Sequence, residues 1–222
     1  TPDPTPDPTP TPDHTVGMWV NNGVGWWWKI TGGDYAKNET LTLDGRVFRF
    51  DQNGYMLTGW VYWDGTWHYH NSAGVQVTGW LDQGGAWYFL MPDTGSMATG
   101  WTMVADRWVY FSDGGVMATG WVSAGTAWYY LDPSGSMHTG WLQQGGSWYY
   151  LNTDSGAMVM GWLQLGVSWY YLTPGTGAMA TGWLKDGDSW YYLKPGSGQM
   201  ATGRVWIGWR YYRFSETGQL IR

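Results

Sequence analysis

The stretch TGWLKDGDSWYYLKPGSGQMATG, residues 181–203, decides the fold, because most of the chain after residue 58 repeats it. A Gly-Trp pair recurs along the chain at intervals of 20 or 21 residues. The tryptophans of these pairs are Trp60, Trp80, Trp101, Trp121, Trp141, Trp162 and Trp183. A period this regular is the signature of a repeat architecture. Function must therefore be sought in one repeat and its neighbour.

A second tryptophan follows each of these after seven residues, and this spacing predicts a β-hairpin. If Trp183 faces Trp190 across an antiparallel ladder, Asp186-Gly187 remains as a two-residue turn. Asp-Gly is favoured in type I′ turns because both central residues need positive φ. The second tryptophans of the series are Trp67, Trp87, Trp108, Trp128, Trp148, Trp169 and Trp190.

Three other hairpins bear on this register. In the first hairpin, Asn22-Gly23 occupies the same place between Trp19 and Trp26, and Asn-Gly is a strong turn signal. Val104-Ala105 and Trp63-Asp64 suit such a turn less well, so we expect a shifted or longer loop in those two repeats.

The two faces of each predicted hairpin carry different residues. Side chains alternate between faces along a strand, so Trp190 and Tyr192 share a face while Tyr191 points away. We expect the middle tyrosines to be structural or surface residues of the opposite face; they are Tyr88, Tyr129, Tyr149, Tyr170 and Tyr191. A lone hairpin is marginally stable, so its neighbours must cover its aromatic face. The sequence therefore predicts an all-β fold, a β-solenoid of about ten stacked hairpins with repeats of 20–21 residues.

Composition restricts the kind of ligand. The 222 residues include 21 Trp, 16 Tyr and 35 Gly but only 13% charged residues, which is far from the average of globular proteins. A net charge of −6 without a Lys/Arg cluster argues against nucleic acid as a partner and is compatible with a cationic ligand. No apolar run is long enough to predict a membrane span, and the absence of Cys excludes disulfides.

The chain divides into a linker and a repeat array. Residues 1–15, TPDPTPDPTPTPDHT, predict an extended Thr/Pro/Asp linker of the kind that joins domains, so we expect any catalytic domain to lie outside this chain. Residues 16–222 form the array. Its units at about 39–57 and 203–222 are degenerate: Thr40 and Val47 replace the tryptophans in the first, and Arg204 replaces one in the second. Capping of the array explains such atypical ends.

These residues carry a family resemblance. The stretch 181–203 resembles the choline-binding repeat of Gram-positive surface proteins, autolysins and phage lysins, and GDYAKN (33–38) with GYMLTGW (54–60) resembles the first repeats of such autolysins. The resemblance covers residues 17–222. It implies a left-handed β-solenoid that binds choline or phosphocholine of wall or lipoteichoic acid and holds an attached domain at the cell surface. It implies an extracellular location at the cell wall or cell surface, or a phage-encoded protein that acts on the wall, and no cofactor.

The resemblance also implies where choline binds. Each site takes the two tryptophans of one hairpin, the third aromatic residue of the next hairpin and usually the intervening Met. The implied sets are Trp60, Trp67 and Phe89; Trp80, Trp87, Tyr110 and Met97; Trp101, Trp108, Tyr130 and Met117; Trp121, Trp128, Tyr150 and Met137; Trp141, Trp148, Tyr171 and Met158; and Trp162, Trp169, Tyr192 and Met179. A trimethylammonium group suits such π faces, at about 0.5 to 2 kcal/mol per contact.

Two further tryptophan pairs are not expected to bind. By the same pattern, the third wall beside Trp19 and Trp26 is Arg49, and the third wall beside Trp183 and Trp190 is Arg213. A fixed guanidinium repels a second cation, so neither place is predicted to take choline.

Other functions remain open on sequence alone. A glucan- or carbohydrate-binding array of the glucosyltransferase or clostridial-toxin type has similar repeats, although paired tryptophans favour choline. A purely structural spacer is a third reading. No carboxylate pair, nucleophile set or phosphate loop recurs, so we expect a binding module and no enzyme. His68 and His70 lie two residues apart without a third ligand nearby, which is a poor metal site.

Overall fold

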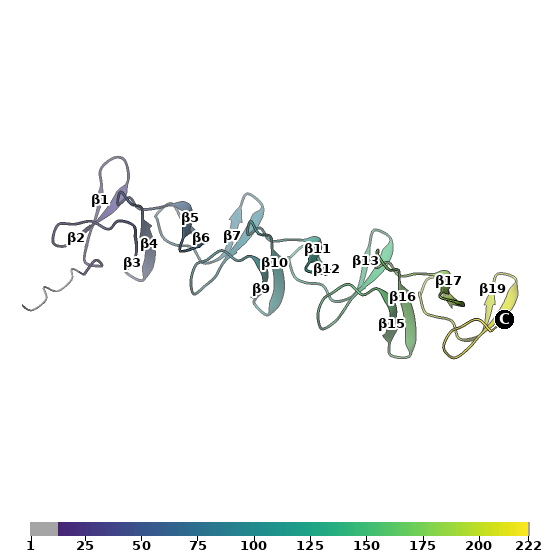
Figure 1. Cartoon of the computed structure of the whole chain (residues 1–222). Helices are drawn as coiled ribbons and strands as arrows, with labels where there is room; N and C mark the ends of the chain where they lie inside the picture. Colours follow the sequence, from purple (N-terminus) through teal and green to yellow (C-terminus); the bar gives the residue numbers. More distant parts are fainter. Residues whose placement is uncertain (1–12, 222) are drawn as a thin grey trace, which may run out of the picture. The chain divides into compact units, whose positions relative to one another are not determined.

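The computed structural model describes residues 13–221, and these form twenty short strands paired as ten antiparallel hairpins (Figure 1). The predicted all-β fold with about ten hairpins is confirmed. Most of the predicted linker, residues 1–12, lies outside the described residues. The strands are β1 (Gly17–Asn21), β2 (Trp26–Ile30), β3 (Glu39–Leu43), β4 (Arg46–Phe50), β5 (Gly59–Trp63), β6 (Thr66–His70), β7 (Gly79–Gln83), β8 (Ala86–Leu90), β9 (Gly100–Val104), β10 (Arg107–Phe111), β11 (Gly120–Ala124), β12 (Ala127–Leu131), β13 (Gly140–Gln144), β14 (Ser147–Leu151), β15 (Gly161–Leu165), β16 (Ser168–Leu172), β17 (Gly182–Asp186), β18 (Ser189–Leu193), β19 (Gly203–Ile207) and β20 (Arg210–Phe214).

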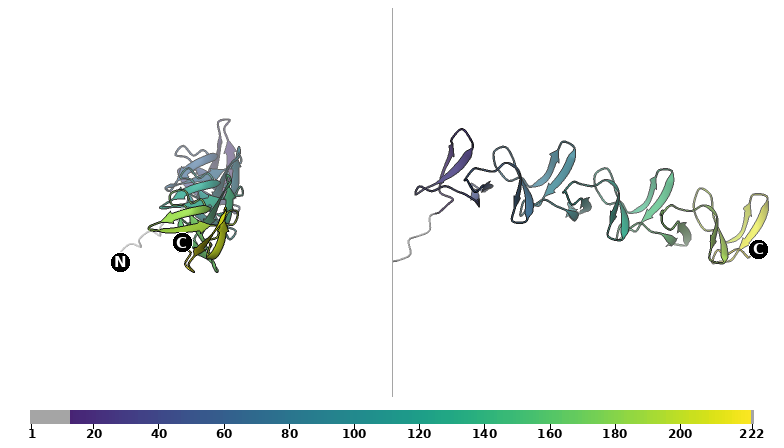
Figure 2. Two further views of the ribbon diagram at one scale, coloured as in Figure 1. Left: turned by 90° about the vertical axis from the view of Figure 1, so that its right-hand side faces the viewer. Right: turned by 45° about the horizontal axis from the view of Figure 1, so that its top comes forward.

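The hairpins fall into two compact units. One comprises Phe111–Met117 and the described residues up to Gly100; the other comprises Trp101–Tyr110 and the residues from Ala118 onward. The right-hand view of Figure 2 shows that each hairpin is a separate pair of strands joined to the next by a loop. Every sheet therefore has only two strands, and each hairpin depends on its neighbours for stability.

The strand register differs from the prediction by two residues. Trp183 faces Tyr192, and Trp190 faces Lys185. The two-residue turn is therefore Gly187-Asp188, with positive φ at Gly187 (56°) and not at Asp188, as in a type II′ turn. The predicted register was wrong because a glycine suits the first position of a type II′ turn as well as the second position of a type I′ turn. A shift of two keeps every side chain on its predicted face.

The two repeats that were expected to have a shifted or longer loop have two-residue turns, each shifted by one residue from the place considered in the sequence. Asp64-Gly65 and Ala105-Asp106 both have positive φ at their two central residues, as a type I′ turn requires. The first hairpin is the irregular one, because Trp19 faces Trp28 and the loop spans the four residues Asn22–Gly25. The predicted Asn22-Gly23 turn was therefore wrong.

The core of each unit is narrow. The residue after the third position of each hairpin pairs with the first residue of the hairpin, which is Gly in all repeats but that of β3 and β4, and it is apolar in most repeats. These side chains are almost fully buried: Phe50, Leu90 and Phe111 in the first unit, and Leu131, Leu151, Leu172, Leu193 and Phe214 in the second. His70 holds this position in the hairpin of β5 and β6, and it is also buried.

Loops join each hairpin to the one before it. The amide of Met200, in the loop after β18, donates a hydrogen bond of 2.8 Å to the carbonyl oxygen of Trp169 on β16. The same bond recurs from Met97 to Trp67, Met117 to Trp87, Met137 to Trp108, Met158 to Trp128 and Met179 to Trp148. A loop therefore fixes the backbone of the second tryptophan of the preceding hairpin. Within residues 13–221 no helix is long and apolar enough to cross a membrane.

Candidate functional site

The cage built on Trp141 and Trp148 shows how the repeats form a cavity. The two indole rings lie 6.3 Å apart at 86°, and Tyr170 from β16 lies 5.0 Å from Trp141 at 68°. Together with Met179 they line an open cavity of about 300 Å³. Three ring faces and a thioether thus surround a space that is large enough for a small organic cation.

Local structure places each of these walls. Trp141 faces Tyr150 and Trp148 faces Gln143, so the two tryptophans are diagonal neighbours on one face of their hairpin. Tyr170 faces Leu163 on the opposite face of the next hairpin, and that face packs against the first. Met179 is held by the hydrogen bond from its amide to the Trp148 carbonyl, 2.7 Å long.

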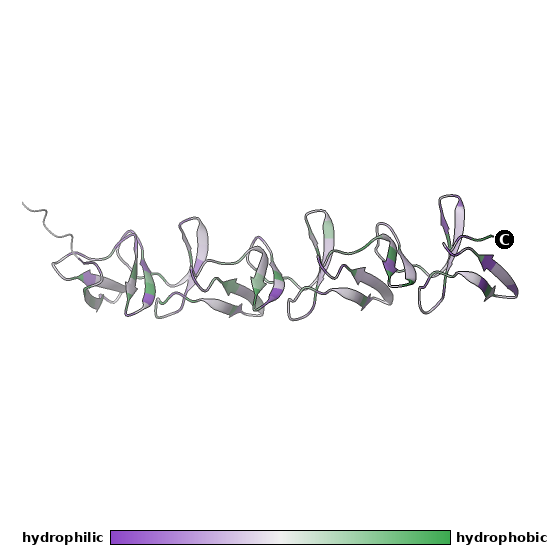
Figure 3. Ribbon diagram, turned by 90° about the horizontal axis from the view of Figure 1, so that it is seen from below, coloured by the Kyte–Doolittle hydropathy of each residue, from purple (hydrophilic) through white to green (hydrophobic). Residues whose placement is uncertain are grey.

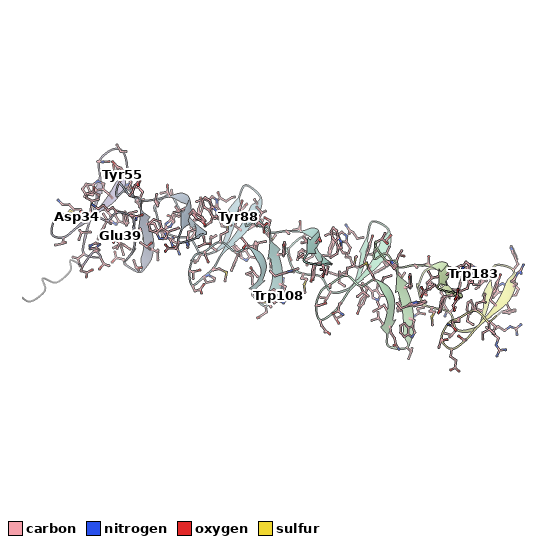
Figure 4. All side chains as sticks on the ribbon, in the orientation of Figure 1. Asp34, Glu39, Tyr55, Tyr88, Trp108 and Trp183 are labelled. Carbon is pink, nitrogen blue, oxygen red and sulfur yellow. The ribbon has the colours of Figure 1, made fainter. Side chains whose placement is uncertain are left out.

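The same arrangement recurs in both units, and Figure 4 labels one residue from each of three further cages, Tyr88, Trp108 and Trp183. In the first unit, Trp60, Trp67, Tyr88 and Met97 line a cavity of about 290 Å³. In the second, Trp101, Trp108, Tyr129 and Met137 line one of about 300 Å³. Corresponding contacts between a first tryptophan and the middle tyrosine of the next hairpin are Trp121–Tyr149 (5.0 Å), Trp162–Tyr191 (4.8 Å) and Trp183–Tyr212 (4.9 Å).

The third wall of the cages described above is not the residue that was expected. The middle aromatic residue of the next hairpin lies there, so Tyr129 and not Tyr130 joins Trp101. Tyr130 packs inside its own hairpin against Trp121, at 5.3 Å. Four other expected third walls also face the first tryptophan of their own hairpin; they are Phe89, Tyr150, Tyr171 and Tyr192. The physical reason is that the opposite face of a hairpin, where the middle residue points, covers the preceding hairpin.

The methionines are also displaced by one repeat relative to the expected sets. Met137 lines the cavity of Trp101 and Trp108, where Met117 was expected, while the Met117 amide bonds to the Trp87 carbonyl. Likewise Met97 lines the cavity of Trp60 and Trp67. Four expected sets therefore combined the tryptophans of one cage with the methionine of the cage before it; these are the sets of Trp101, Trp121, Trp141 and Trp162. Since Trp80 and Tyr110 belong to different units, that set stays a prediction.

The comparisons with known proteins agree with this architecture. A family model described as a choline-binding repeat matches residues 57–100, 98–137, 119–162 and 159–204. The chain belongs to the choline-binding repeat family. The family resemblance inferred from the sequence is thereby confirmed, and the repeats form a binding module. No curated protein matches the chain.

Solved structures of Streptococcus pneumoniae proteins share the fold. CbpJ is 29% identical with a TM-score of 0.65, covering 92% of this chain and 94% of its own. Choline binding protein F is 28% identical with a TM-score of 0.60, covering 94% of both chains. The choline-binding domain of CbpL is 28% identical with a TM-score of 0.62, covering 86% of this chain and all of its own.

The choline-binding repeats at the two ends differ from the prediction. Phe48 lies 4.9 Å from Trp19, and Tyr212 lies beside Trp183, so aromatic rings and not Arg49 or Arg213 form the third walls. The expectation that these places are blocked by arginine was therefore based on the wrong residues. The N-terminal cage is a cavity of about 410 Å³, lined by Trp19, Trp26, Arg46, Phe48, Met56, Ser72, Ala73 and Val75.

The degenerate hairpin of β3 and β4 has a buried polar cluster where other choline-binding repeats have a cage. The Arg49 Nη1 atom lies 2.9 Å from His70 Nε2 and donates to Gln76 Oε1. His70 Nδ1 lies 2.8 Å from the Gly74 carbonyl oxygen, so Nδ1 donates there and Nε2 accepts from Arg49. Burial lowers the pKa of His70, and the nearby Arg49 charge lowers that pKa further. The guanidinium is thus a permanent internal cation beside a neutral imidazole.

His68 and His70 lie on one strand face, as the sequence predicted, because they face Val61 and Gly59. Burial lowers the pKa of His68 as well. Within residues 13–221 there is no group of three or more His, Cys, Asp or Glu residues that could hold a metal ion.

Proposed function

We propose that the array binds the quaternary ammonium group of choline in the aromatic cages between successive hairpins. The observation that supports this function is the cavity of about 300 Å³ between Trp141, Trp148, Tyr170 and Met179. A trimethylammonium group donates no strong hydrogen bond, and it is attracted to ring faces by about 0.5 to 2 kcal/mol per ring. A related structure is described as the choline-binding domain of CbpL.

We propose further that the bound choline belongs to phosphocholine of wall or lipoteichoic acid, which places the module at a cell surface outside the cell. One cage gives weak to moderate affinity, and engagement of several cages by one polymer raises avidity by roughly 10² to 10⁴. Such a module would hold an attached domain at the wall. A related structure is that of the modular autolysin LytC from Streptococcus pneumoniae, 26% identical, of which the match covers 46%.

The melting temperature of the full chain tests the ligand class. Ligands that bind only the folded array raise its melting temperature by mass action. Choline and tetramethylammonium should both do so, whereas a glucan oligosaccharide at the same concentration should not. A rise with the sugar alone would assign the array to the carbohydrate-binding class, and no rise with any ligand would favour a structural spacer.

A pair of variants connects this effect to a cage. Trp148→Ala removes one wall of the cage described above and should reduce the choline-induced rise. Trp209→Ala is the matched control, because Trp209 lies in a turn with 96% of its surface exposed and lines none of the described cavities. Equal losses in both variants would contradict the cage assignment.

A further inference from the structure

The cages differ in the charge at their rims. Asp113 lies at the rim of the cage of Trp60, and Asp154 at the rim of the cage of Trp101. The cage of Trp141 has the neutral residues Gly196 and Ser197 in these places. The N-terminal cage has the opposite charge, because Arg46 is part of its lining. Cages with similar aromatic walls therefore present different electrostatic surroundings to the same cation.

Strand β4 places Arg46 at that rim. Arg46 and Phe48 are two residues apart on one strand, so both point toward the hairpin of β1 and β2. The corresponding residue, two positions before Tyr149, is Ser147, and two positions before Tyr170 it is Ser168. In the last hairpin, where Figure 3 shows purple (hydrophilic) segments beside green ones, Arg210 takes the same place relative to Tyr212.

The guanidinium of Arg46 is available to a ligand. Its side chain is exposed, and the one ion pair formed within residues 13–221 joins His14 and Glu39. The cation–π contacts in this part of the chain involve Lys37, Arg49 and Arg204, so Arg46 does not stack on the cage rings. Among the described residues, no carboxylate neutralises the charge at this rim and no ring engages it.

We propose that the N-terminal cage is selective for phosphocholine over choline, with Arg46 binding the phosphate. This inference rests on the proposed function, that cages take the quaternary ammonium. In phosphocholine the phosphate follows the ammonium group after two methylene groups, so an ammonium between the rings leaves the phosphate at the rim. Arg pairs with phosphate through two parallel hydrogen bonds. Without the phosphate, Arg46 repels the choline cation, whereas Asp113 and Asp154 attract it and repel phosphate.

Methionine methyl groups give a separate signal for each cage. The full chain with 13C-labelled methionine methyls is titrated with choline and, separately, with phosphocholine, and signals are assigned by single Met→Leu variants. Met56 reports the N-terminal cage and Met137 the cage with Asp154. At Met56, phosphocholine should bind about two- to five-fold more tightly than choline, the range of an exposed ion pair. At Met137 the preference should be reversed, and added salt should weaken both preferences.

Two substitutions, each of which removes one positive charge, test the role of Arg46. Arg46→Gln should abolish the phosphocholine preference at Met56 and leave Met137 unchanged. Arg204→Gln is the control, because Arg204 stacks on Tyr211 at 4.2 Å and is absent from the cavity linings. It should leave both ratios unchanged.

The outcomes separate the inference from the proposed function. An unchanged ratio at Met56 in Arg46→Gln, or the same preference at Met56 and Met137, would overturn the selectivity of the N-terminal cage. That selectivity would also be overturned if choline shifts the other methionine signals but neither ligand shifts the signal of Met56. If neither ligand moves any methionine signal, the proposed function itself fails.

Discussion

At the scale of single residues, His70 makes stability depend on pH. Its folded-state pKa is lowered from 6.5 by burial and by Arg49, while the unfolded chain protonates near 6.5. Below pH 6.5 the unfolded state therefore binds more protons than the folded state. The stability that depends on a neutral His70 is present above pH 6.5 and is lost as the pH falls through the folded-state pKa. The charged and titratable groups nearby are Arg49, His68 and Asp64.

We expect the free energy of unfolding to decrease from pH 7 to pH 5, by at most about 1.4 kcal/mol per pH unit for one proton. His70→Gln should flatten this pH dependence in part, because Gln still accepts a hydrogen bond from Arg49 and does not titrate. The pH dependence that remains comes from His68, whose pKa is also lowered. Urea denaturation across this pH range measures the effect. His138→Gln removes a histidine outside the cluster, and an equal flattening there would contradict the assignment to His70.

At the scale of elements, the loops stack through glycine against methionine. Gly198 follows β18 with φ of 69°, and a Cβ added there would overlap the Sδ of Met179. Met179 lines the cage of Trp141 and Trp148. Gly198 therefore helps to determine the position of Met179 in the cage of Trp141 and Trp148.

Two glycines with the same φ separate backbone strain from this contact. Gly203 also has φ of 69°, but a Cβ there would have no neighbour within 4 Å. Both Gly198→Ala and Gly203→Ala should lose about 1 to 2 kcal/mol of stability through strain. Gly198→Ala should in addition weaken choline binding at Met179, as measured by its methyl signal. Equal affinities in the two variants would show that Met179 relaxes without cost.

At the scale of the whole molecule, stability sums over contacts between neighbouring repeats, and a ligand in a cage adds to one such contact. At a free choline concentration about 100-fold above the dissociation constant, each cage should add about 2.7 kcal/mol. Trp148→Ala should remove one such increment, and the double variant with Trp108→Ala should remove two, since they line different cavities. Urea denaturation with and without choline measures the total choline-induced stabilisation, and loss of all of this stabilisation in Trp148→Ala would contradict independent cages.

Much of this organisation could be predicted from the sequence. The spacing of tryptophans gave the hairpins, their number and the aromatic face. The register could not be fixed, because Gly187 fits either turn type. The third wall depends on how consecutive hairpins are rotated, which no spacing within a repeat encodes. A usable signal was present: Arg49 and Arg213 fill the third position at the ends, whereas Phe48 and Tyr212 keep the middle position aromatic.

The hydrogen bonds from the loop methionines have a consequence for inheritance. Each cage takes its tryptophans from one repeat, and its tyrosine and methionine from the next. An in-frame duplication of a single repeat in the gene therefore adds one complete cage. The cages on either side of the new repeat stay complete, because each junction still joins the tryptophans of one repeat to the tyrosine and methionine of the next. Unequal recombination between these similar segments can lengthen or shorten the array, and selection can adjust its avidity without redesigning any site.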